Sequence, residues 1–236
     1  MNAIAIITAR GGSKRIPYKN IKNFYGKPII AYSIQAALKS GLFEEVMVST
    51  DDKKIAEMAT FYGAKVPFYR SAKASDDYAT TVDVLREVLN EYQKSGRTFD
   101  WMCCLYPTAP FVTAKKLQQA MAMMEAGKAD ALVPIVQFSY PPQRCFVMQN
   151  NKLAYKYLEC VNTRSQDLEP LYHDAGQFYL AKVKTFLKSN SLVTDNTISY
   201  LLSEMEAQDI DTLEDWKIAE VKYRIMIENG NVGKYD

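Results

Sequence analysis

The sequence has few of the residues that build metal clusters or disulfide frameworks. His173 is its only histidine, and none of its four cysteines stands in C-x-x-C spacing. A zinc site built on a histidine cluster is therefore excluded, and the cysteines are expected to be reduced and structural. Cys103 and Cys104 are neighbours, so in a strand their side chains would point to opposite faces.

An excess of charge of one sign and long apolar runs are also lacking. The 29 basic and 27 acidic residues leave a net charge of only +2, which argues against non-specific binding of nucleic acid. No apolar run approaches the roughly 20 residues that cross a bilayer, so no membrane partner is expected. The residues after Met1 lack the pattern of a secretory signal, and the cytoplasm is the expected location.

The common catalytic and nucleotide-binding fingerprints are missing as well. The sequence contains no G-x-S-x-G element, no G-x-x-x-x-G-K-[ST] loop and no G-x-G-x-x-G turn. The first absence argues against a serine hydrolase with a nucleophile elbow. The other two mean that any nucleotide site must use a different kind of loop.

What the 236 residues do contain is an alternation of apolar runs and segments of helical periodicity. This alternation predicts one α/β domain, residues 1–236, with a largely parallel sheet covered by helices on both faces. Ligands of such sheets lie at the carboxyl ends of the strands. The polar residues 230–236 are expected to fray. We expect strands over 3–8, 46–49, 101–106, 131–136 and 177–180, and helices over 28–40, 52–62, 80–94, 114–125 and 213–227.

Residues 139–174 interrupt the alternation. They contain Pro141-Pro142, Asn150-Asn151 and short β-like pieces, which predict an irregular insertion or a hairpin arm. Such an arm would bury little within its own domain. We therefore expect it to pair with a second copy of the chain, giving a homodimer.

The segment after the first predicted strand combines glycines with cations. It runs Ala9-Arg10-Gly11-Gly12-Ser13-Lys14-Arg15 and continues to Lys19-Asn20. The glycines let the backbone turn tightly and present N–H groups to an anion, and the four basic side chains add positive charge. This composition predicts a triphosphate-binding loop. A solvated basic turn is the alternative.

A second signal is the segment Gln208-Asp209-Ile210-Asp211. In an extended segment, residues i and i+2 lie on one face, where two carboxylates repel each other unless a cation lies between them. Oxygen ligands of this kind suit Mg²⁺, which usually shares its coordination shell with substrate phosphates. Helix capping explains the segment equally well, because Asp211 with Glu214, or Thr212 with Asp215, fits a capping box.

Three further polar segments have plain structural explanations. Thr50 or Asp51 is predicted to cap the helix that begins near residue 52. Thr108, between Pro107 and Pro110, could present a hydroxyl at the ligand edge of the sheet or merely form a turn. His173 beside Asp174 could carry out acid–base chemistry, although a single histidine is more often structural.

Taken in order, these motifs resemble those of the CMP-sugar-acid synthetases, a family of cytidylyltransferases. Sialate-specific members usually carry glutamine where this chain has Tyr106. The resemblance covers nearly the whole chain and rests on residues 6–14, Lys19-Asn20, Gly26-Lys27-Pro28, residues 48–52, residues 67–70, residues 107–110 and residues 209–211. Residues 75–81, 162–167 and 173–179 resemble the branch of the family that acts on pseudaminic acid.

The resemblance implies a GT-A-like nucleotidyltransferase fold and a dimer formed partly by the 139–174 arm. It further implies that CMP passes from CTP to the anomeric hydroxyl of an acidic nine-carbon sugar, with pseudaminic acid favoured and pyrophosphate released. Mg²⁺ would be the cofactor. The product would supply glycosylation of surface structures such as flagella.

The resemblance also implies roles for individual residues. Asp209 and Asp211 would hold the metal, and Arg10 and Lys19 would join them as catalytic residues. The nucleotide would be bound by Ala9, Arg10, Gly11, Gly12, Ser13, Lys14, Lys19, Asn20, Arg70, Thr80 or Thr81, and Thr108. Donors for the sugar and its carboxylate would come from Tyr106, Arg164, Gln166, His173 and Gln177.

Three alternatives stay open on the sequence. The first is the same reaction on N-acetylneuraminic, legionaminic or Kdo-type acid. The second is a non-catalytic regulatory protein that binds a nucleotide on the same fold. The third is a GT-A glycosyltransferase, although the D-x-D motif of such enzymes usually lies near mid-chain, whereas Asp209 and Asp211 lie near the end.

Overall fold

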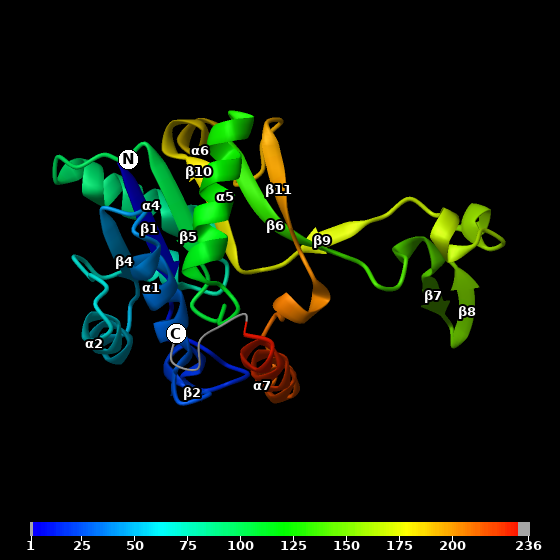
Figure 1. Cartoon of the computed structure of the whole chain (residues 1–236). Helices are drawn as coiled ribbons and strands as arrows, with labels where there is room; N and C mark the ends of the chain where they lie inside the picture. Colours follow the sequence, from blue (N-terminus) through cyan, green and yellow to red (C-terminus); the bar gives the residue numbers. More distant parts are fainter. Residues whose placement is uncertain (1, 231–236) are drawn as a thin grey trace.

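The computed structural model describes residues 2–230, so most of the tail predicted to fray, residues 231–236, lies outside the described part. A central mixed sheet dominates the fold (Figure 1). Its strand order is β11-β6-β10-β5-β1-β4, with β9 paired to β6; β10 runs antiparallel to both its neighbours and β9 antiparallel to β6. The strands are β1 (Ala3–Thr8), β4 (Glu45–Ser49), β5 (Trp101–Leu105), β6 (Ala131–Gln137), β9 (Tyr172–Asp174), β10 (Phe178–Lys182) and β11 (Thr197–Leu202).

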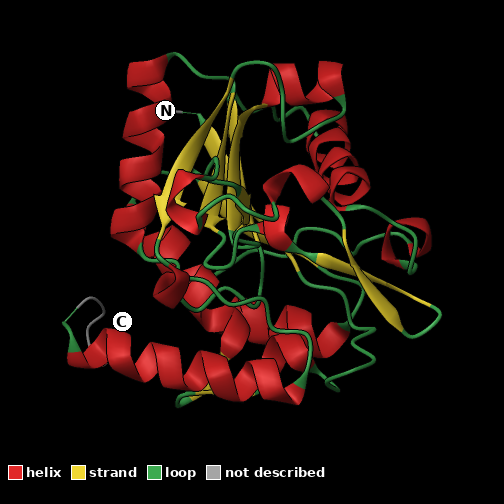
Figure 2. Cartoon of the chain, turned by 90° about the vertical axis from the view of Figure 1, so that its right-hand side faces the viewer, coloured by secondary structure: helices red, strands yellow, loops and turns green. Residues whose placement is uncertain are grey.

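Helices cover both faces of this sheet, as predicted (Figure 2). One layer consists of α1 (Ile29–Ser40), α2 (Lys53–Phe61) and α5 (Ala114–Gly127), and the other of α4 (Thr81–Lys94) and α6 (Val183–Ser189). Cys103 and Cys104 on β5 belong to the two opposite core clusters, so the predicted alternation is confirmed. All four cysteines are free.

A third cluster fixes the C-terminal helix α7 (Leu213–Glu228) below the sheet. Phe24 lies between Trp216 and Tyr223 of α7, with its ring centroid 5.5 Å and 5.4 Å from theirs in edge-to-face geometry. Phe24 belongs to the short hairpin of β2 (Asn23–Phe24) and β3 (Lys27–Pro28). These contacts pack α7 against the hairpin that follows the first loop.

Several features of the fold depart from the predictions; one is that residues 172–174, expected in the arm, form β9 and pair with β6 in the main sheet. The strand β11 and the helix α6 were not predicted, because their polar and partly exposed residues give no clear period. The cap of α2 is also different: Asp52, rather than Thr50 or Asp51, accepts the N–H groups of Lys54 and Ile55. That prediction was wrong, and the correction leaves the Asp51 carboxylate available for another contact.

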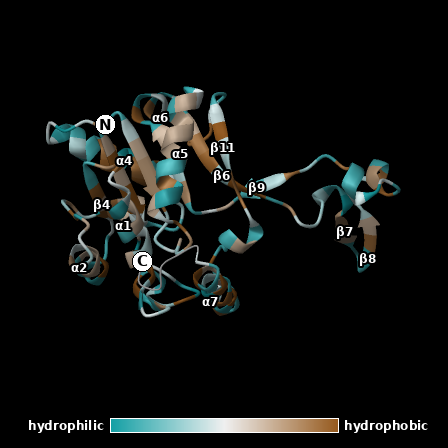
Figure 3. Cartoon of the chain, in the orientation of Figure 1, coloured by the Kyte–Doolittle hydropathy of each residue, from teal (hydrophilic) through white to brown (hydrophobic). Residues whose placement is uncertain are grey.

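Residues 139–171 form an arm that projects from the body of the molecule (Figure 1). The arm carries the hairpin of β7 (Phe146–Gln149) and β8 (Lys152–Tyr155), together with three short 3₁₀ helices at Pro142–Arg144, Leu158–Cys160 and Ser165–Asp167. Apolar residues recur along it (Figure 3). The large exposed ones are Tyr140, Phe146, Met148, Leu153, Leu158 and Leu171. Within residues 2–230, no helix combines the length and the apolar character that spanning a bilayer requires.

The short helix α3 (Ala72–Ser75) follows α2 and precedes α4 along the chain, and two further 3₁₀ helices span Lys19–Ile21 and Glu204–Glu206. At the edge strand β4, the buried carboxylate of Glu45 accepts hydrogen bonds from Tyr92 and Arg97, and from Lys65 at 3.1 Å. Burial by itself raises the pKa of Glu45, but these three donors outweigh it and lower the pKa below its ordinary value of 4.5. The interaction connects β4 to α4 and to the loop that follows it.

Glu45→Gln should therefore lower the free energy of unfolding at pH 7 by on the order of 1–3 kcal/mol. Because the folded pKa is depressed, this stabilisation is present above pH 4.5 and is lost as the pH falls through the folded pKa. Urea unfolding at pH 7 and below pH 4 should show the gap between wild type and variant narrowing in acid. The exposed neighbour Glu44, changed to Gln, is the control; an equal gap at both pH values would contradict the assignment.

Candidate active site

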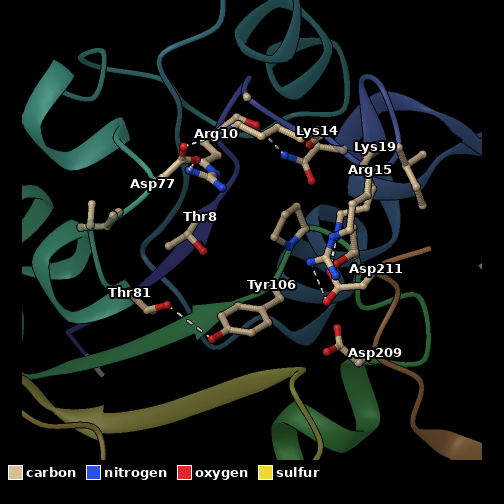
Figure 4. Close-up of a pocket in the computed structure, with 18 of the residues that line it drawn as sticks. Thr8, Arg10, Lys14, Arg15, Lys19, Asp77, Thr81, Tyr106, Asp209 and Asp211 are labelled. Atoms are coloured by element: carbon tan, nitrogen blue, oxygen red, sulfur yellow. Dashed lines mark hydrogen bonds and ion pairs between the residues drawn. The ribbon is translucent and has the colours of Figure 1, made fainter. Parts of the chain in front are cut away.

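A cavity of about 580 Å³ opens at the carboxyl ends of β1 and β5 (Figure 4). Its walls come from the segment after β1, the loop after β5, the start of α4 and the segment before α7. It brings together many of the predicted site residues. Those that line it are Arg10, Gly12, Ser13, Lys14, Lys19, Asn20, Arg70, Thr81, Tyr106, Thr108, Asp209 and Asp211.

The glycine-containing loop is held in shape from two sides. The Gly11 N–H donates to a carboxylate oxygen of Asp51 at 2.8 Å, and the Asn20 side-chain amide donates to the carbonyl oxygen of Arg10 at 2.9 Å. A Cβ atom on Gly11 would lie 2.9 Å from the Cβ of Asp52, so glycine is required there. Gly11 and the fully buried Ala9 therefore support the loop from behind the cavity and do not line it.

Two carboxylates neutralise the four cations of this loop. Asp77 accepts from Arg10 at 3.0 Å and from Lys14 at 2.5 Å. Asp211 pairs with Arg15 at 2.8 Å and with Lys19 at 3.2 Å. Hydrogen bonds from Lys14 and Arg10 hold the pKa of Asp77 below its ordinary value. All four cations are thus already arranged in ion pairs with carboxylate oxygens. The oxygens of a polyphosphate could accept from the same donors.

The aspartate pair is presented by a buried residue between its members. Ile210 is fully buried in the α7 cluster, and both flanking carboxylates line the cavity. Thr212 caps α7 in a capping box with Asp215. Of the two capping boxes the sequence allowed, the second is the one formed, so Asp209 and Asp211 are not capping residues.

The electrostatics of this pair suit a divalent cation. Burial raises the pKa of Asp209 above its ordinary value, and the charge of Asp211 raises it further. A cation between the two carboxylates would relieve this penalty. Within residues 2–230, no group of three or more His, Cys, Asp or Glu side chains forms a metal site by itself. Two carboxylates that leave most positions to phosphates and water fit the coordination of Mg²⁺.

The residues predicted to contact the base and sugar of the nucleotide differ in their surroundings. Arg70 is buried, donates to the Ser49 side chain at 3.0 Å and to its carbonyl oxygen at 2.6 Å, and its pKa is lowered by burial to about 10. Of the two candidate threonines, Thr80 caps α4, whereas Thr81 lines the cavity with its hydroxyl 3.3 Å from that of Tyr106.

The predicted sugar-binding residues are not gathered in one place. His173 lines an adjoining cavity of about 320 Å³ that shares Asp209 with the first. Gln177 is buried, and its amide donates to the carbonyl oxygen of Glu206 at 2.5 Å. Arg164 lies on the arm, paired with Asp167 at 2.8 Å, and Gln166 lies beside it. Tyr106 alone of this set lines the first cavity.

Sequence reasoning missed two carboxylates that contact the basic loop, Asp51 and Asp77. Asp51 supports the loop by accepting from the Gly11 N–H. The sequence signal was that two carboxylates, Asp51 and Asp52, follow β4, whereas the cap of α2 uses only one of them. Asp77 contacts Arg10 and Lys14 across more than sixty residues of chain. No local sequence pattern predicts this contact, because only the fold brings the turn after α3 next to the first loop.

Known proteins resemble the chain in sequence and in fold. A family model described as "Cytidylyltransferase" matches residues 4–228. The chain is 41% identical over 230 residues to pseudaminic acid cytidylyltransferase of Campylobacter jejuni subsp. jejuni serotype O:2, covering 97% of this chain and 99% of that protein. It is 35% identical to CMP-N,N'-diacetyllegionaminic acid synthase of Legionella pneumophila, covering 93% and 95%.

A solved structure supports the same grouping at the level of the fold. CMP:2-keto-3-deoxy-manno-octonic acid synthetase in complex with CTP superposes with a TM-score of 0.69 at 18% identity, covering 97% of this chain and 100% of that one. The predicted nucleotidyltransferase fold, a mostly parallel sheet flanked by helices, is thereby confirmed. Because the family match spans nearly all of the described residues, the chain belongs to the cytidylyltransferase family.

Proposed function

We propose that this cytidylyltransferase transfers CMP from CTP to the anomeric hydroxyl of an acidic nine-carbon sugar, releasing pyrophosphate. The observation that carries the proposal is the single cavity in which the basic loop of Arg10, Lys14 and Lys19 faces Asp209 and Asp211. The reaction is assigned to the cytoplasm, where CTP is made, and the product would supply glycosylation of surface structures such as flagellin.

Pseudaminic acid is the proposed sugar. The argument is the 41% identity to the Campylobacter jejuni enzyme over nearly the full length of both chains. Legionaminic acid is the second candidate, supported by the 35% identity to the Legionella pneumophila synthase. Tyr106 favours pseudaminic and legionaminic acid over sialic acid. Its aromatic ring lines the cavity at the position where sialate-specific members usually carry the amide of a glutamine.

The residues of the loop would act on the phosphates. The sugar hydroxyl attacks the α-phosphate in line, and negative charge grows on the phosphoryl oxygens and on the departing pyrophosphate. Arg10, Lys14 and Lys19 lie where fixed cations can neutralise that charge, which stabilises the transition state more than the ground state. Lys19 also donates to the Ile210 carbonyl oxygen at 2.6 Å, so it holds the aspartate segment in register with the loop.

Asp209 and Asp211 would hold the metal. Bound there, Mg²⁺ would supply Lewis-acid polarisation of a phosphate oxygen and offset charge on the nucleotide. The two carboxylates keep their position through buried Ile210 and the capped start of α7. Arg15 and Lys19, now paired with Asp211, are the donors that phosphate oxygens would take over.

The arm would form a homodimer and carry part of the sugar site. Its exposed apolar side chains need a partner surface, and the hairpin does not fold back on its own domain (Figure 3). The adjoining cavity is acidic, because three carboxylates and one lysine line it. These residues are Asp174, Glu204, Asp209 and Lys222. An acidic sugar needs further donors, and an arm from a second copy would deliver the cation Arg164 and the neutral amide donor Gln166.

The reaction itself can be tested by pyrophosphate release with Mg²⁺, CTP and one of four acids in parallel: pseudaminic, legionaminic, N-acetylneuraminic and Kdo. We expect release with pseudaminic acid to exceed the others by at least about tenfold in kcat/KM. A preference for another acid would move the sugar assignment. Absence of turnover with all four, despite CTP binding, would support the non-catalytic alternative.

Asp211→Ala should lower turnover by about 10²-fold or more, because it removes half of the metal-binding pair. CTP affinity without Mg²⁺ should stay the same or increase, since Arg15 and Lys19 lose their internal partner. Initial rates and calorimetric titration separate the two effects. Glu214→Gln, an exposed change in the first turn of α7, is the control. Near-normal turnover in a folded Asp211→Ala protein would exclude the metal role.

Changing Met148 and Leu153 together to Asp should weaken dimerisation. These side chains face each other as a cross-strand pair of the hairpin and are 72% and 69% exposed in the single chain. Buried carboxylates at an interface are strongly unfavourable. Light scattering should report a monomer, whereas Leu187→Asp, an exposed leucine on α6, should leave the dimer intact. A dimeric double variant would argue that the hairpin lies outside the interface.

A further inference from the structure

The phosphate side of the cavity contains an anion that belongs to the chain itself. One oxygen of Asp77 accepts from Arg10 and the other accepts from Lys14 (Figure 4). A phosphate group bridging Arg10 and Lys14 would use the same donors with the same charge-assisted geometry. In the structure, the Asp77 carboxylate therefore occupies the position between these two cations that a phosphate would take.

Asp77 lies in a turn that is anchored at both ends and that contacts the basic loop through Arg10 and Lys14; Arg10 also donates to the carbonyl oxygen of Asp76 at 3.1 Å. One oxygen of Asp76 accepts from the N–H groups of Tyr78 and Ala79, at 2.8 Å and 2.6 Å, which shapes the turn. Upstream, Ala74 is buried; downstream, Thr80 caps α4. Between these anchors Tyr78 is 91% exposed. Because the turn has few buried contacts, its movement away from the loop would break its bonds to Arg10 and Lys14 and leave both helices in place.

We propose that Asp77 is a specificity-determining residue, an internal counter-ion that a polyphosphate displaces and that single phosphate groups do not. This inference rests on the proposed function, because it concerns the same nucleotide site. It goes beyond that function in assigning Asp77 a role against competing anions, including inorganic phosphate and nucleoside monophosphates.

The argument is one of competition between an attached and a free anion. A tethered carboxylate is present at an effective concentration in the millimolar range, so a free ligand must outbind it. A single phosphate group gains only the contacts it takes from Asp77. A polyphosphate reaches Arg15 and Lys19 as well, which lie on the opposite wall and pair with Asp211. Displacement is therefore favourable only for a ligand with several adjacent charges.

The test is calorimetric titration of pyrophosphate and of inorganic phosphate, at constant ionic strength, into the whole protein and into Asp77→Asn. Asparagine keeps the size of the side chain and removes its charge. We expect the variant to bind both anions about three- to tenfold more tightly, the range appropriate to two solvent-exposed ion pairs. The relative gain should be larger for inorganic phosphate, so the preference for pyrophosphate should shrink.

Asp76→Asn is the matched control, because it removes the same charge one residue away. The Asp76 carboxylate contacts neither Arg10 nor Lys14, and an asparagine oxygen can still accept from the turn. We expect its anion affinities to match those of the wild type. Equal tightening in both variants would reduce the effect to general electrostatics and overturn the proposal. Weaker or unchanged binding by Asp77→Asn would overturn it too.

A double-mutant cycle identifies the contact. In a Lys14→Gln background the tightening caused by Asp77→Asn should fall, because one of its two partners is gone. A full effect in that background would contradict the proposed competition. None of these titrations includes a sugar. If wild type shows no turnover with any acidic sugar but Asp77→Asn binds more tightly, the proposed function fails and the inference stands; the reverse pattern refutes the inference alone.

Discussion

The main constraint on this structure is the repulsion among the positively charged side chains that line its cavity. Five cations, Arg10, Lys14, Arg15, Lys19 and Arg70, line one cavity of about 580 Å³. Left unbalanced, such a group would destabilise the folded chain by mutual repulsion. Asp77 and Asp211 each neutralise two of these cations, while Arg70 is held by Ser49. The cations are therefore balanced within the chain itself, and the same charges remain available for a ligand.

Several buried contacts keep the aspartate segment opposite the loop. Ile210 packs among the aromatic residues of α7, so its flanking carboxylates turn outward. Upstream, two contacts hold Glu206 in place. Its carboxylate pairs with the buried Lys116 of α5 at 2.9 Å, and its carbonyl oxygen accepts from the side-chain amide of Gln177. Lys222 of α7 donates to the carbonyl oxygens of Glu204 and Ala207. Gln177, predicted to bind the sugar, thus helps to support the segment that carries Asp209 and Asp211.

Much of this could be predicted from the sequence, and the remainder has physical reasons. Alternating apolar runs predict β1, β4, β5 and β6 because buried parallel strands need apolar residues on both faces. Local glycine and charge patterns predict the basic loop, and the D-x-D spacing predicts the aspartate pair. The partner of Gly11 at Asp51 and the partners of Arg10 and Lys14 at Asp77 are tertiary contacts. They depend on which loops meet at the sheet edge, which no local pattern encodes.

The charge of the cavity also indicates what it can accommodate. Three carboxylates, Asp77, Asp209 and Asp211, stand against its five cations, leaving an excess of two positive charges. A nucleoside triphosphate with one divalent cation carries about two negative charges, so the pair would make the cavity nearly neutral. An acidic sugar then adds a carboxylate that these residues no longer balance. Since the adjoining cavity is itself acidic, the compensating cation must come from elsewhere. In the proposed homodimer the arm of a second copy would provide that cation, because the arm projects from the body of the molecule and carries Arg144 and Arg164.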